Sequence, residues 1–465
     1  MPYKILFIKP RVNTKVSLLD IPLGILSLSA YVKKYSRFPI KTNCLDLRLS
    51  KSKGILKQTI DVFKPDLIGI SLMDCERHFL SQYQSILEKY ARKIPIVTGG
   101  PYPTCHYETI LRNTCISYVI VGEGERSFHK LVQCLAQGLS VNDIKGLAWC
   151  SQNGQPVYNG QMPYINNLDE IPVPDYNLID INQYQGFHPN MNGVLAENRY
   201  IHIMSSRACP FHCIFCHNMF GKHVRQRSVK HFITEIKVLR YQYNIKEFHI
   251  IDDYFNFNLK RMHAILDEII DNHLDIKIAF PNALRGDQLE ADDIAKLKQA
   301  GTYMINFSIE TGSKRLQKKI GKKINLNKIL HNITIAKQMG IITRGYFMLG
   351  FPTETLSELN ATINLACKSD LSMVSFFTVI PFQGTKLYEW AFSEYPEIID
   401  NEESGYWSHG KYYSQSTGIR LKSIKKKATI KFYSIRRLRW LIRHTPRKFY
   451  YVIRFVHSAI TILSS

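Results

Sequence analysis

Short apolar runs alternate with longer amphipathic stretches through the first 150 residues of the chain. The apolar runs read as strands, and they are Lys4–Ile8, Ile40–Leu47, Asp66–Leu72, Ile94–Gly99 and Tyr118–Gly122. The amphipathic stretches have helical spacing, as in Ile25–Tyr35, His78–Arg92 and Ser127–Gln137. This alternation predicts a doubly wound parallel sheet.

Glycines gather at the carboxyl ends of these predicted strands. In a doubly wound sheet, ligands bind beyond the carboxyl ends of the strands. Here those ends carry Pro10, Ser71–Met73, Gly99–Pro101 and Gly122–Glu125. Glycine at such a place lets a large flat ligand approach the backbone closely. The alternative is that these glycines only form tight turns.

The β/α alternation resumes near residue 196 and continues to about residue 395. Strands are predicted at Tyr200–Met204, Phe248–Ile251, Ile276–Phe280, Met304–Ile309, Thr343–Leu349 and Met373–Ile380. Helices are predicted between them, including Val229–Tyr241, Leu259–Asn272, Ala291–Ala300, Lys328–Met339 and Ser357–Cys367. Six repeats are too few for a closed eight-stranded barrel, so they predict a partial parallel barrel that is open on one side.

The predicted fold is therefore α/β with four parts. A doubly wound, flavodoxin- or Rossmann-like domain covers residues 1–145, and a partial (β/α)6 barrel covers residues 196–395. Between them, residues 146–195 hold a hairpin-like pair, Gly146–Cys150 and Pro156–Asn159, and a proline-rich connector that we interpret as a linker. Residues 396–465 form a basic, helical tail.

Most of the excess positive charge lies in this tail. The chain has a net charge of +23, and fourteen Lys and Arg residues but no acid follow Glu403, so the first 403 residues carry only +9. Thr445 and Pro446 are suited to start a second tail helix, whose apolar residues recur at helical spacing: Phe449, Val452, Ile453, Val456, Ile460 and Leu463. Three interpretations stay open for residues 404–465: packing on the barrel, docking on an anionic membrane surface, and, less favoured, binding of RNA.

The sequence favours a cytoplasmic location, with peripheral contact at the inner face of a membrane through the tail. The start of the chain has no secretory signal pattern, and no apolar run is long enough to span a bilayer. Ten cysteines, three of them close together, fit a reducing compartment better than a disulfide framework.

Those three residues, Cys209, Cys213 and Cys216, follow the predicted strand Tyr200–Met204 directly. Three thiolates at this spacing suit one soft metal centre and leave a metal coordination position for a ligand that is not protein. A zinc site completed by His212 or His217 is the alternative on spacing alone.

The stretch Ser206–Cys216, with Phe215 before the last cysteine, resembles the motif of the radical S-adenosylmethionine enzymes. In that family three cysteines hold a 4Fe-4S cluster, and the fourth iron binds S-adenosylmethionine. Three further segments resemble family motifs at the ends of later barrel strands: Ile251–Asp253, Phe307–Ser313 and Leu349–Thr355. The resemblance implies that Phe215, Asp252, Asp253, Glu310 and Gly350 contact S-adenosylmethionine. Taken singly, the two aspartates also suit a helix cap and Glu310 a solvated charge.

A doubly wound domain joined to such a barrel resembles the cobalamin-binding radical S-adenosylmethionine proteins. The implied cobalamin contacts are Ser71, Gly99, Gly100, Gly122, Glu123 and Gly124. Domains that bind cobalt through histidine carry that residue after the first strand, but Lys9–Gly24 contains no histidine. We therefore expect the lower face of the cobalamin to lack this ligand.

The resemblance implies radical chemistry on an unactivated carbon, with C-methylation of a lipid or small molecule as the leading hypothesis. The first alternative is a cyclase or rearrangement enzyme that uses the same parts without methyl transfer. An alternative of another class is a zinc- and RNA-binding protein. The implied partners are a substrate and an electron donor such as flavodoxin or ferredoxin, whereas nucleic acid is the less favoured partner.

Overall fold

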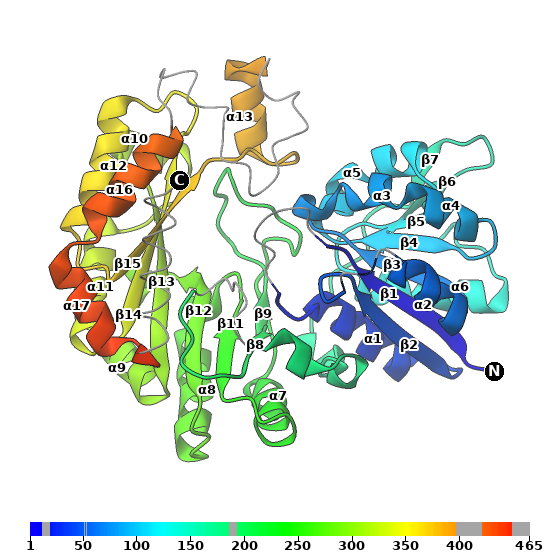
Figure 1. Cartoon of the computed structure of the whole chain (residues 1–465), viewed down its shortest axis with the longest axis horizontal. Helices are drawn as coiled ribbons and strands as arrows, with labels where there is room; N and C mark the ends of the chain where they lie inside the picture. The colour runs from blue at the N-terminus through cyan, green and yellow to red at the C-terminus, as the bar shows by residue number, and fades with distance from the viewer. Residues whose placement is uncertain (12–18, 51, 53, 186–192, 397–420, 449–465) are drawn as a thin grey trace. The chain divides into compact units, whose positions relative to one another are not determined.

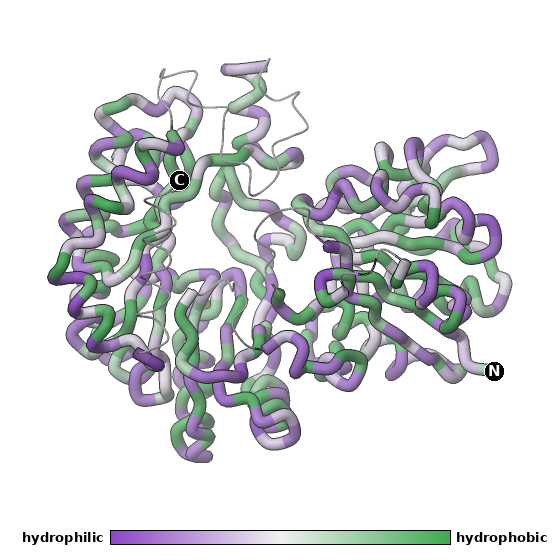
Figure 2. Tube along the Cα trace, viewed as in Figure 1, coloured by the Kyte–Doolittle hydropathy of each residue, from purple (hydrophilic) through white to green (hydrophobic). Residues whose placement is uncertain are grey.

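The computed structural model describes residues 1–11, 19–50, 52, 54–185, 193–396 and 421–448. The chain divides into two compact units, Met1–Asn190 and Met191–Ser465, and each contains one large sheet (Figure 1). The strands of both sheets are mostly hydrophobic, whereas hydrophilic residues predominate on the outer helices and loops (Figure 2).

The first unit is built on a seven-stranded sheet with the order β2-β1-β3-β4-β5-β6-β7. Its strands are β1 (Tyr3–Lys9), β2 (Ile40–Asp46), β3 (Leu67–Ser71), β4 (Ile96–Gly99), β5 (Tyr118–Ile120), β6 (Leu147–Cys150) and β7 (Pro156–Tyr158). The first five are parallel, and their order confirms the predicted flavodoxin-like doubly wound fold. The order reverses between β1 and β3, which places the ligand-binding edge at the carboxyl ends of these strands.

Alternate residues of β1 pack into two cores, one on each face of this sheet. Leu6 and Ile8 belong to one core and Ile5 and Phe7 to the other, and all four are buried. The helices of the unit are α1 (Leu23–Tyr35), α2 (Ile55–Phe63), α3 (Phe79–Gln82), α4 (Gln84–Ala91), α5 (Pro101–Asn113) and α6 (Glu125–Gln137). Burial on both faces explains why the strands appear in the sequence as continuous apolar runs.

The prediction of one helix over His78–Arg92 is wrong. Two helices, α3 and α4, occupy this stretch, and Tyr83 between them has φ −110° and ψ 10°. The Tyr83 ring stacks on Phe79 with 4.8 Å between centroids, and both side chains pack in the core. Tertiary packing here outweighs the helical spacing of the sequence.

The hairpin and the connector that follow α6 pack onto the first unit. Strand β6 pairs antiparallel with β5 and extends the sheet. Asp175 in the connector accepts a 2.6 Å hydrogen bond from Ser29 and forms a 2.6 Å ion pair with Lys33, both on α1. Further on, the Tyr184 hydroxyl donates to Asp46 at 2.9 Å.

The second unit contains a six-stranded parallel sheet with the order β15-β14-β13-β12-β11-β8. Its strands are β8 (Tyr200–Ile203), β11 (Glu247–Ile250), β12 (Lys277–Leu284), β13 (Thr302–Glu310), β14 (Ile342–Leu349) and β15 (Met373–Thr378). The edge strands β8 and β15 do not pair in the described part of the chain, so the sheet is open there. This confirms the predicted partial (β/α)6 barrel.

Helices connect successive strands of the barrel, and polar caps fix where several of them begin. The helices are α7 (Val229–Gln242), α8 (Leu259–Asp271), α9 (Ala291–Gln299), α10 (Lys314–Lys319), α11 (Leu326–Gln338), α12 (Leu356–Lys368) and α13 (Lys386–Glu394). Ser228, Asn258, Asn325 and Thr355 each accept a hydrogen bond from a backbone N–H in the first turn of the helix that follows.

Two described tail helices, α16 (Leu421–Phe432) and α17 (Ile435–His444), pack on the barrel. Arg437 donates to the carbonyl oxygens of Cys367 and Ser369 at the end of α12, each at 2.6 Å, and Leu441 is buried against barrel residues. The second tail helix predicted from Thr445 onward, with apolar residues from Phe449 to Leu463, lies outside the described residues. Among the described helices, none is both long and apolar enough to cross a bilayer.

Candidate active site

The three clustered cysteines lie on the loop that leaves the first barrel strand. Strand β8 leads into the two-residue strand β9 (Ser206–Arg207), and the chain returns through β10 (Arg225–Gln226). Cys209 and Cys213 are half-buried and Cys216 is exposed. Ala208, directly before Cys209, has φ +79°, a left-handed conformation that is costly for a residue with a Cβ atom.

Two aspartates at the end of β11 hold the start of this loop. The Asp252 carboxylate is buried and accepts from Ser205 N, Ser205 Oγ and Ser206 Oγ at 2.6, 2.5 and 2.6 Å. Asp253 is exposed and accepts from Ala208 N at 3.1 Å. Asp252 therefore positions the loop. Asp253 makes one hydrogen bond to the loop, and its carboxylate is also accessible to a ligand.

The three thiols differ in how easily they ionise. A hydrogen bond from Cys216, together with the positive charge of Lys322, lowers the pKa of Cys213 to about 6. Donating that hydrogen bond raises the pKa of Cys216, and burial raises the pKa of Cys209. A thiolate at neutral pH is the form that binds iron.

A buried ion pair joins the loop to the end of β13. Glu310 Oε1 lies 2.7 Å from Lys322 Nζ, and Lys322 Nζ lies 5.6 Å from the centroid of the half-buried Phe215 ring. Glu310 itself has φ +68°, a second strained residue at the carboxyl end of a barrel strand. Lys322 is not among the site residues predicted from the sequence.

Gly350 directly follows β14 and has φ +93°, and its backbone N–H is held by Glu354, a residue that the sequence analysis did not single out. The N–H groups of Gly350 and Phe351 donate to Glu354 Oε2 at 2.5 and 3.1 Å. Glu354 is buried, and burial raises the pKa of its carboxyl to about 7.

The donor set fits an iron–sulfur cluster. Three cysteines lie on one accessible loop, one thiol favours the thiolate, and Lys322 and Arg285 add positive charge beside it. Among the described residues, no three His, Cys, Asp or Glu side chains converge on the position of a single metal ion. Of the two histidines considered as zinc ligands, His217 lies against Phe382, with 5.4 Å between ring centroids.

In the first unit, the residues predicted to contact cobalamin lie at the carboxyl ends of β3, β4 and β5. Ser71 pairs with Gly99 in the sheet. Gly100 has φ +113°, and a Cβ atom there would lie 2.5 Å from Leu72 O, so packing of the chain itself requires this glycine. A Cβ on Gly124 would likewise lie 3.1 Å from the Leu28 side chain.

Gly122 is different, because open space surrounds the position of its absent Cβ atom. It has φ +85° with nothing within 4 Å, and its N–H donates to Thr104 Oγ1 at 3.1 Å. The buried Glu123 accepts from Ile165 N at 3.4 Å, and Met73 is 46% exposed just beyond β3. This edge leaves backbone open beside Gly122 and an apolar side chain exposed after β3, which suits a large, flat ligand.

Comparison with known families agrees with both sites. Residues 203–366 match the family model described as Radical SAM superfamily, and residues 12–132 match the B12 binding domain. The first match spans the cysteine loop, Glu310 and Gly350. The second spans the strand ends that carry Gly99 to Gly124.

Similarity to individual proteins extends over most of the chain. An uncharacterized methyltransferase of Pyrococcus horikoshii is 33% identical over 374 residues, covering 80% of this chain and 78% of that protein. Cytidylyl-2-hydroxyethylphosphonate methyltransferase of Streptomyces wedmorensis is 24% identical over 434 residues, covering 83% and 80%.

Among solved structures, TsrM from Kitasatospora setae, a radical S-adenosylmethionine methyltransferase with cobalamin and a 4Fe-4S cluster bound, has the same fold. It aligns with a TM-score of 0.69 at 16% identity, covering 84% of this chain and 76% of that chain. The chain therefore belongs to the radical S-adenosylmethionine enzymes that carry a B12-binding domain, and its cofactors are a 4Fe-4S cluster, S-adenosylmethionine and cobalamin.

Proposed function

We propose that this enzyme methylates an unactivated carbon of a lipid or another small molecule. The observation that carries the proposal is the combination, in one chain, of the cysteine loop and the B12-binding domain, with similarity over most of its length to proteins named as methyltransferases. The family assignment favours the iron–sulfur cluster over the zinc site that the cysteine spacing alone left open.

The residues of the barrel have distinct roles in this proposal. When bound, the three cofactors supply a 5′-deoxyadenosyl radical and a methyl group. Cys209, Cys213 and Cys216 hold the iron, while Asp252 fixes the strand end from which their loop departs. Asp253, Glu310, Phe215 and Gly350 stay our predicted contacts to S-adenosylmethionine, which the exposed Asp253 carboxylate supports.

The barrel lumen supports a substrate with an apolar part. Phe307 on β13 packs beside Gly286 and Ile329 of the outer layer, so the neighbouring Asn306 and Ser308 face the lumen. Asn306 Nδ2 donates to the Tyr346 hydroxyl at 2.5 Å, and the Tyr346 ring lies 5.5 Å from Phe377. These contacts place an aromatic pair on the lumen face.

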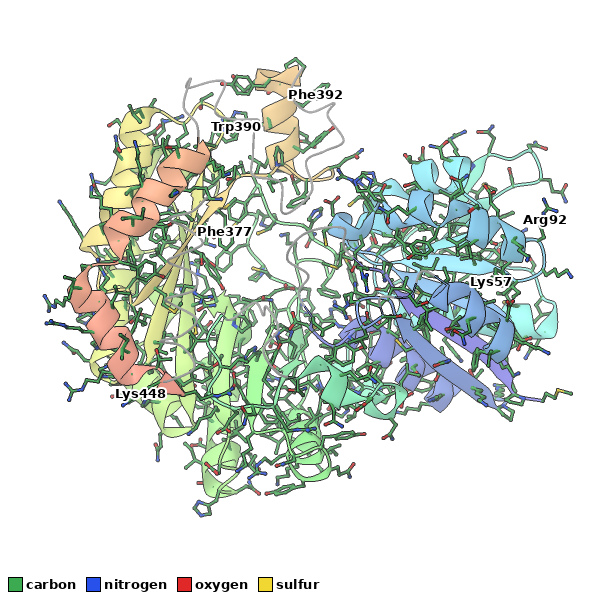
Figure 3. All side chains as sticks on the ribbon, in the orientation of Figure 1. Lys57, Arg92, Phe377, Trp390, Phe392 and Lys448 are labelled. Atoms are coloured by element: carbon green, nitrogen blue, oxygen red, sulfur yellow. The ribbon has the colours of Figure 1, made fainter. Side chains whose placement is uncertain are left out.

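Phe377 is 43% exposed although it belongs to an inner strand face, and it is labelled on β15 in Figure 3. An exposed aromatic ring on this face is a contact surface for apolar groups. The exposed Phe377 ring supports a substrate whose acyl chain or ring system packs against it.

The decisive experiment follows the methyl group. Reconstituted enzyme with cobalamin, methyl-labelled S-adenosylmethionine and extracted lipids or metabolites should give a product that carries the label on carbon. An enzyme that forms 5′-deoxyadenosine and a product of altered structure without label would instead support the cyclase or rearrangement alternative. Enzyme that binds no cobalamin would refute the proposal.

Peripheral membrane contact through residues 404–465 and a cytoplasmic location stay our predictions. In the described part of the tail, Ile430, Ile435 and Ile442 are exposed hydrophobic residues on helices that also expose several Lys and Arg side chains. Apolar side chains among cations suit an anionic lipid surface. Binding to anionic vesicles that persists unchanged after Ile435→Ser and Ile442→Ser would show that the exposed face of α17 does not carry this contact.

A further inference from the structure

A second concentration of positive charge lies on α10, next to the cysteine loop. Residues 311–353 contain no Asp or Glu, and the ten residues Lys314–Lys323 include six cations. These are Lys314, Arg315, Lys318, Lys319, Lys322 and Lys323. Like charges this close repel one another weakly and give the segment a local positive potential.

Only two of the six cations have an acidic partner within the described chain. Lys322 is buried against Glu310, and Arg315 forms a 2.7 Å ion pair with Glu358. Lys314, Lys318, Lys319 and Lys323, which we call the basic patch, are exposed. No described acidic side chain forms an ion pair with any member of the basic patch.

The segment that carries the basic patch touches the cysteine loop directly. Cys213 Sγ lies 3.8 Å from Gly321 O, and Ile214 N donates to Ile320 O at 3.1 Å. Gly321 lies between Lys319 and Lys323 in the sequence. The basic patch therefore lies on the same short segment whose backbone contacts the sulfur atom of Cys213.

Helix α13 adds aromatic surface on the other side of this contact. Leu387 N donates to Ile214 O at 2.9 Å, so α13 also starts against the cysteine loop. Lys319 Nζ lies 4.7 Å from the centroid of the Trp390 ring, and Trp390 is labelled in Figure 3. Exposed aromatic side chains such as Trp are enriched in protein–protein interfaces.

We propose that the basic patch, with Trp390, is the docking surface for a small acidic protein that carries one electron. The inference rests on the proposed radical function, because that function requires an electron at the cysteine loop. In the step itself, the reduced carrier loses one electron and the oxidised cluster gains it, and no proton or bond is exchanged. Charge complementarity would bring the carrier to the loop that holds the iron.

The test compares electron entry from a protein with electron entry from a small molecule. Holoenzyme is mixed anaerobically with reduced bacterial flavodoxin or with dithionite, and the rate of cluster reduction is followed by absorbance and electron paramagnetic resonance. The test variant is Lys318→Glu with Lys319→Glu. The matched control is Lys422→Glu with Lys427→Glu, which makes the same charge change at two exposed lysines of α16.

We expect the α10 variant to be reduced by flavodoxin about tenfold more slowly or worse, with an unchanged rate from dithionite. The α16 variant should behave like the unmodified enzyme with both reductants. Flavodoxin reduction of the unmodified enzyme should also slow as ionic strength rises. Because cluster reduction is measured without substrate, a failure of methyl transfer would leave this result unaffected.

Two outcomes would overturn the proposal. The first is an equal rate of flavodoxin reduction in the α10 variant and the unmodified enzyme, and the second is an equal loss in both variants. If the two glutamates disturb the iron site, the rate of reduction by dithionite falls as well. In that case the proposal is tested with the milder variant Lys318→Gln with Lys319→Gln and with the salt dependence of flavodoxin reduction in the unmodified enzyme. An equal flavodoxin rate together with lost binding to RNA or to anionic vesicles in the α10 variant would assign the basic patch to that ligand instead.

Discussion

Glu310 Oε1 and Lys322 Nζ lie 2.7 Å apart, and both side chains are buried beside the cysteine loop. Lys322 is also the positive charge next to Cys213. One lysine therefore balances a carboxylate and favours a thiolate. Through this pair, Lys322, which belongs neither to the Phe307–Ser313 segment nor to the cysteine loop, connects the two.

Glu310→Gln should destabilise the protein, because it leaves the Lys322 cation buried without a counter-charge. Removing one partner of a buried pair costs about 3–5 kcal/mol. The control is Asp267→Asn, since the Asp267–Lys296 pair has a similar separation of 2.6 Å but Asp267 is 49% exposed. Loss of an exposed pair costs about 1 kcal/mol or less. Denaturant unfolding of the two variants without cofactors would contradict the assignment if both lost the same small amount.

Cys213→Ser should abolish 5′-deoxyadenosine formation while leaving cobalamin bound. The substitution removes the thiol with the lowest pKa from the iron site, and the B12-binding domain is a separate unit. Iron content, 5′-deoxyadenosine and the cobalamin spectrum are measured on the same preparation. Cys367→Ser, at a half-buried cysteine of α12, is the control and should retain iron. A Cys213→Ser enzyme that still cleaved S-adenosylmethionine would refute the site.

The strands and the cysteine loop could be predicted because their signals are local. Apolar runs mark strands that are buried on both faces, and three cysteines within eight residues are visible without a fold. Lys322 could not be predicted in the same way. It is one of six cations in ten residues, and only the turn after α10 shows which of them reaches Glu310.

The glycines of the first unit show a second limit of the sequence. Gly99, Gly100, Gly122 and Gly124 all stand at strand ends, and the sequence treats them alike. In the structure, a Cβ atom at position 100 would clash with the carbonyl oxygen of Leu72, whereas a Cβ atom at position 122 would meet open space. Packing between distant segments makes this distinction, and no local pattern records it.

Gly100→Ala should therefore destabilise the first unit by more than an ordinary glycine substitution. A residue other than glycine at φ +113° and ψ −173° costs about 1–3 kcal/mol, and the clash with Leu72 O at 2.5 Å adds to it, for a total of about 2–4 kcal/mol. Gly138→Ala is the control, because Gly138 also has a positive φ, +66°, in the milder left-handed helical region, and has nothing within 4 Å. Equal unfolding free energies for the two variants would show that the contact with Leu72 has no energetic weight.

The buried carboxyl of Glu354 should make the stability of the protein depend on pH, and burial sets the direction of that dependence. Burial raises the pKa of this carboxyl from 4.5 to about 7, so the folded protein binds the proton more tightly than the unfolded chain does. Its contribution to stability is complete below about pH 4.5 and is lost as the pH rises through about 7. At about 1.36 kcal/mol per pH unit, the loss amounts to about 3 kcal/mol.

Glu354→Gln should remove this loss, because the amide oxygen can still accept from Gly350 N and Phe351 N while no charge is buried. The variant should match the unmodified protein near pH 5 and be more stable near pH 8, by up to about 3 kcal/mol. Glu358→Gln is the control, since Arg315 lowers the pKa of Glu358 to about 2, and its effect should be the same at both pH values. Denaturant unfolding of the cofactor-free proteins measures each difference. A Glu354→Gln difference that did not change between the two pH values would mean that the buried carboxyl is already ionised near pH 5.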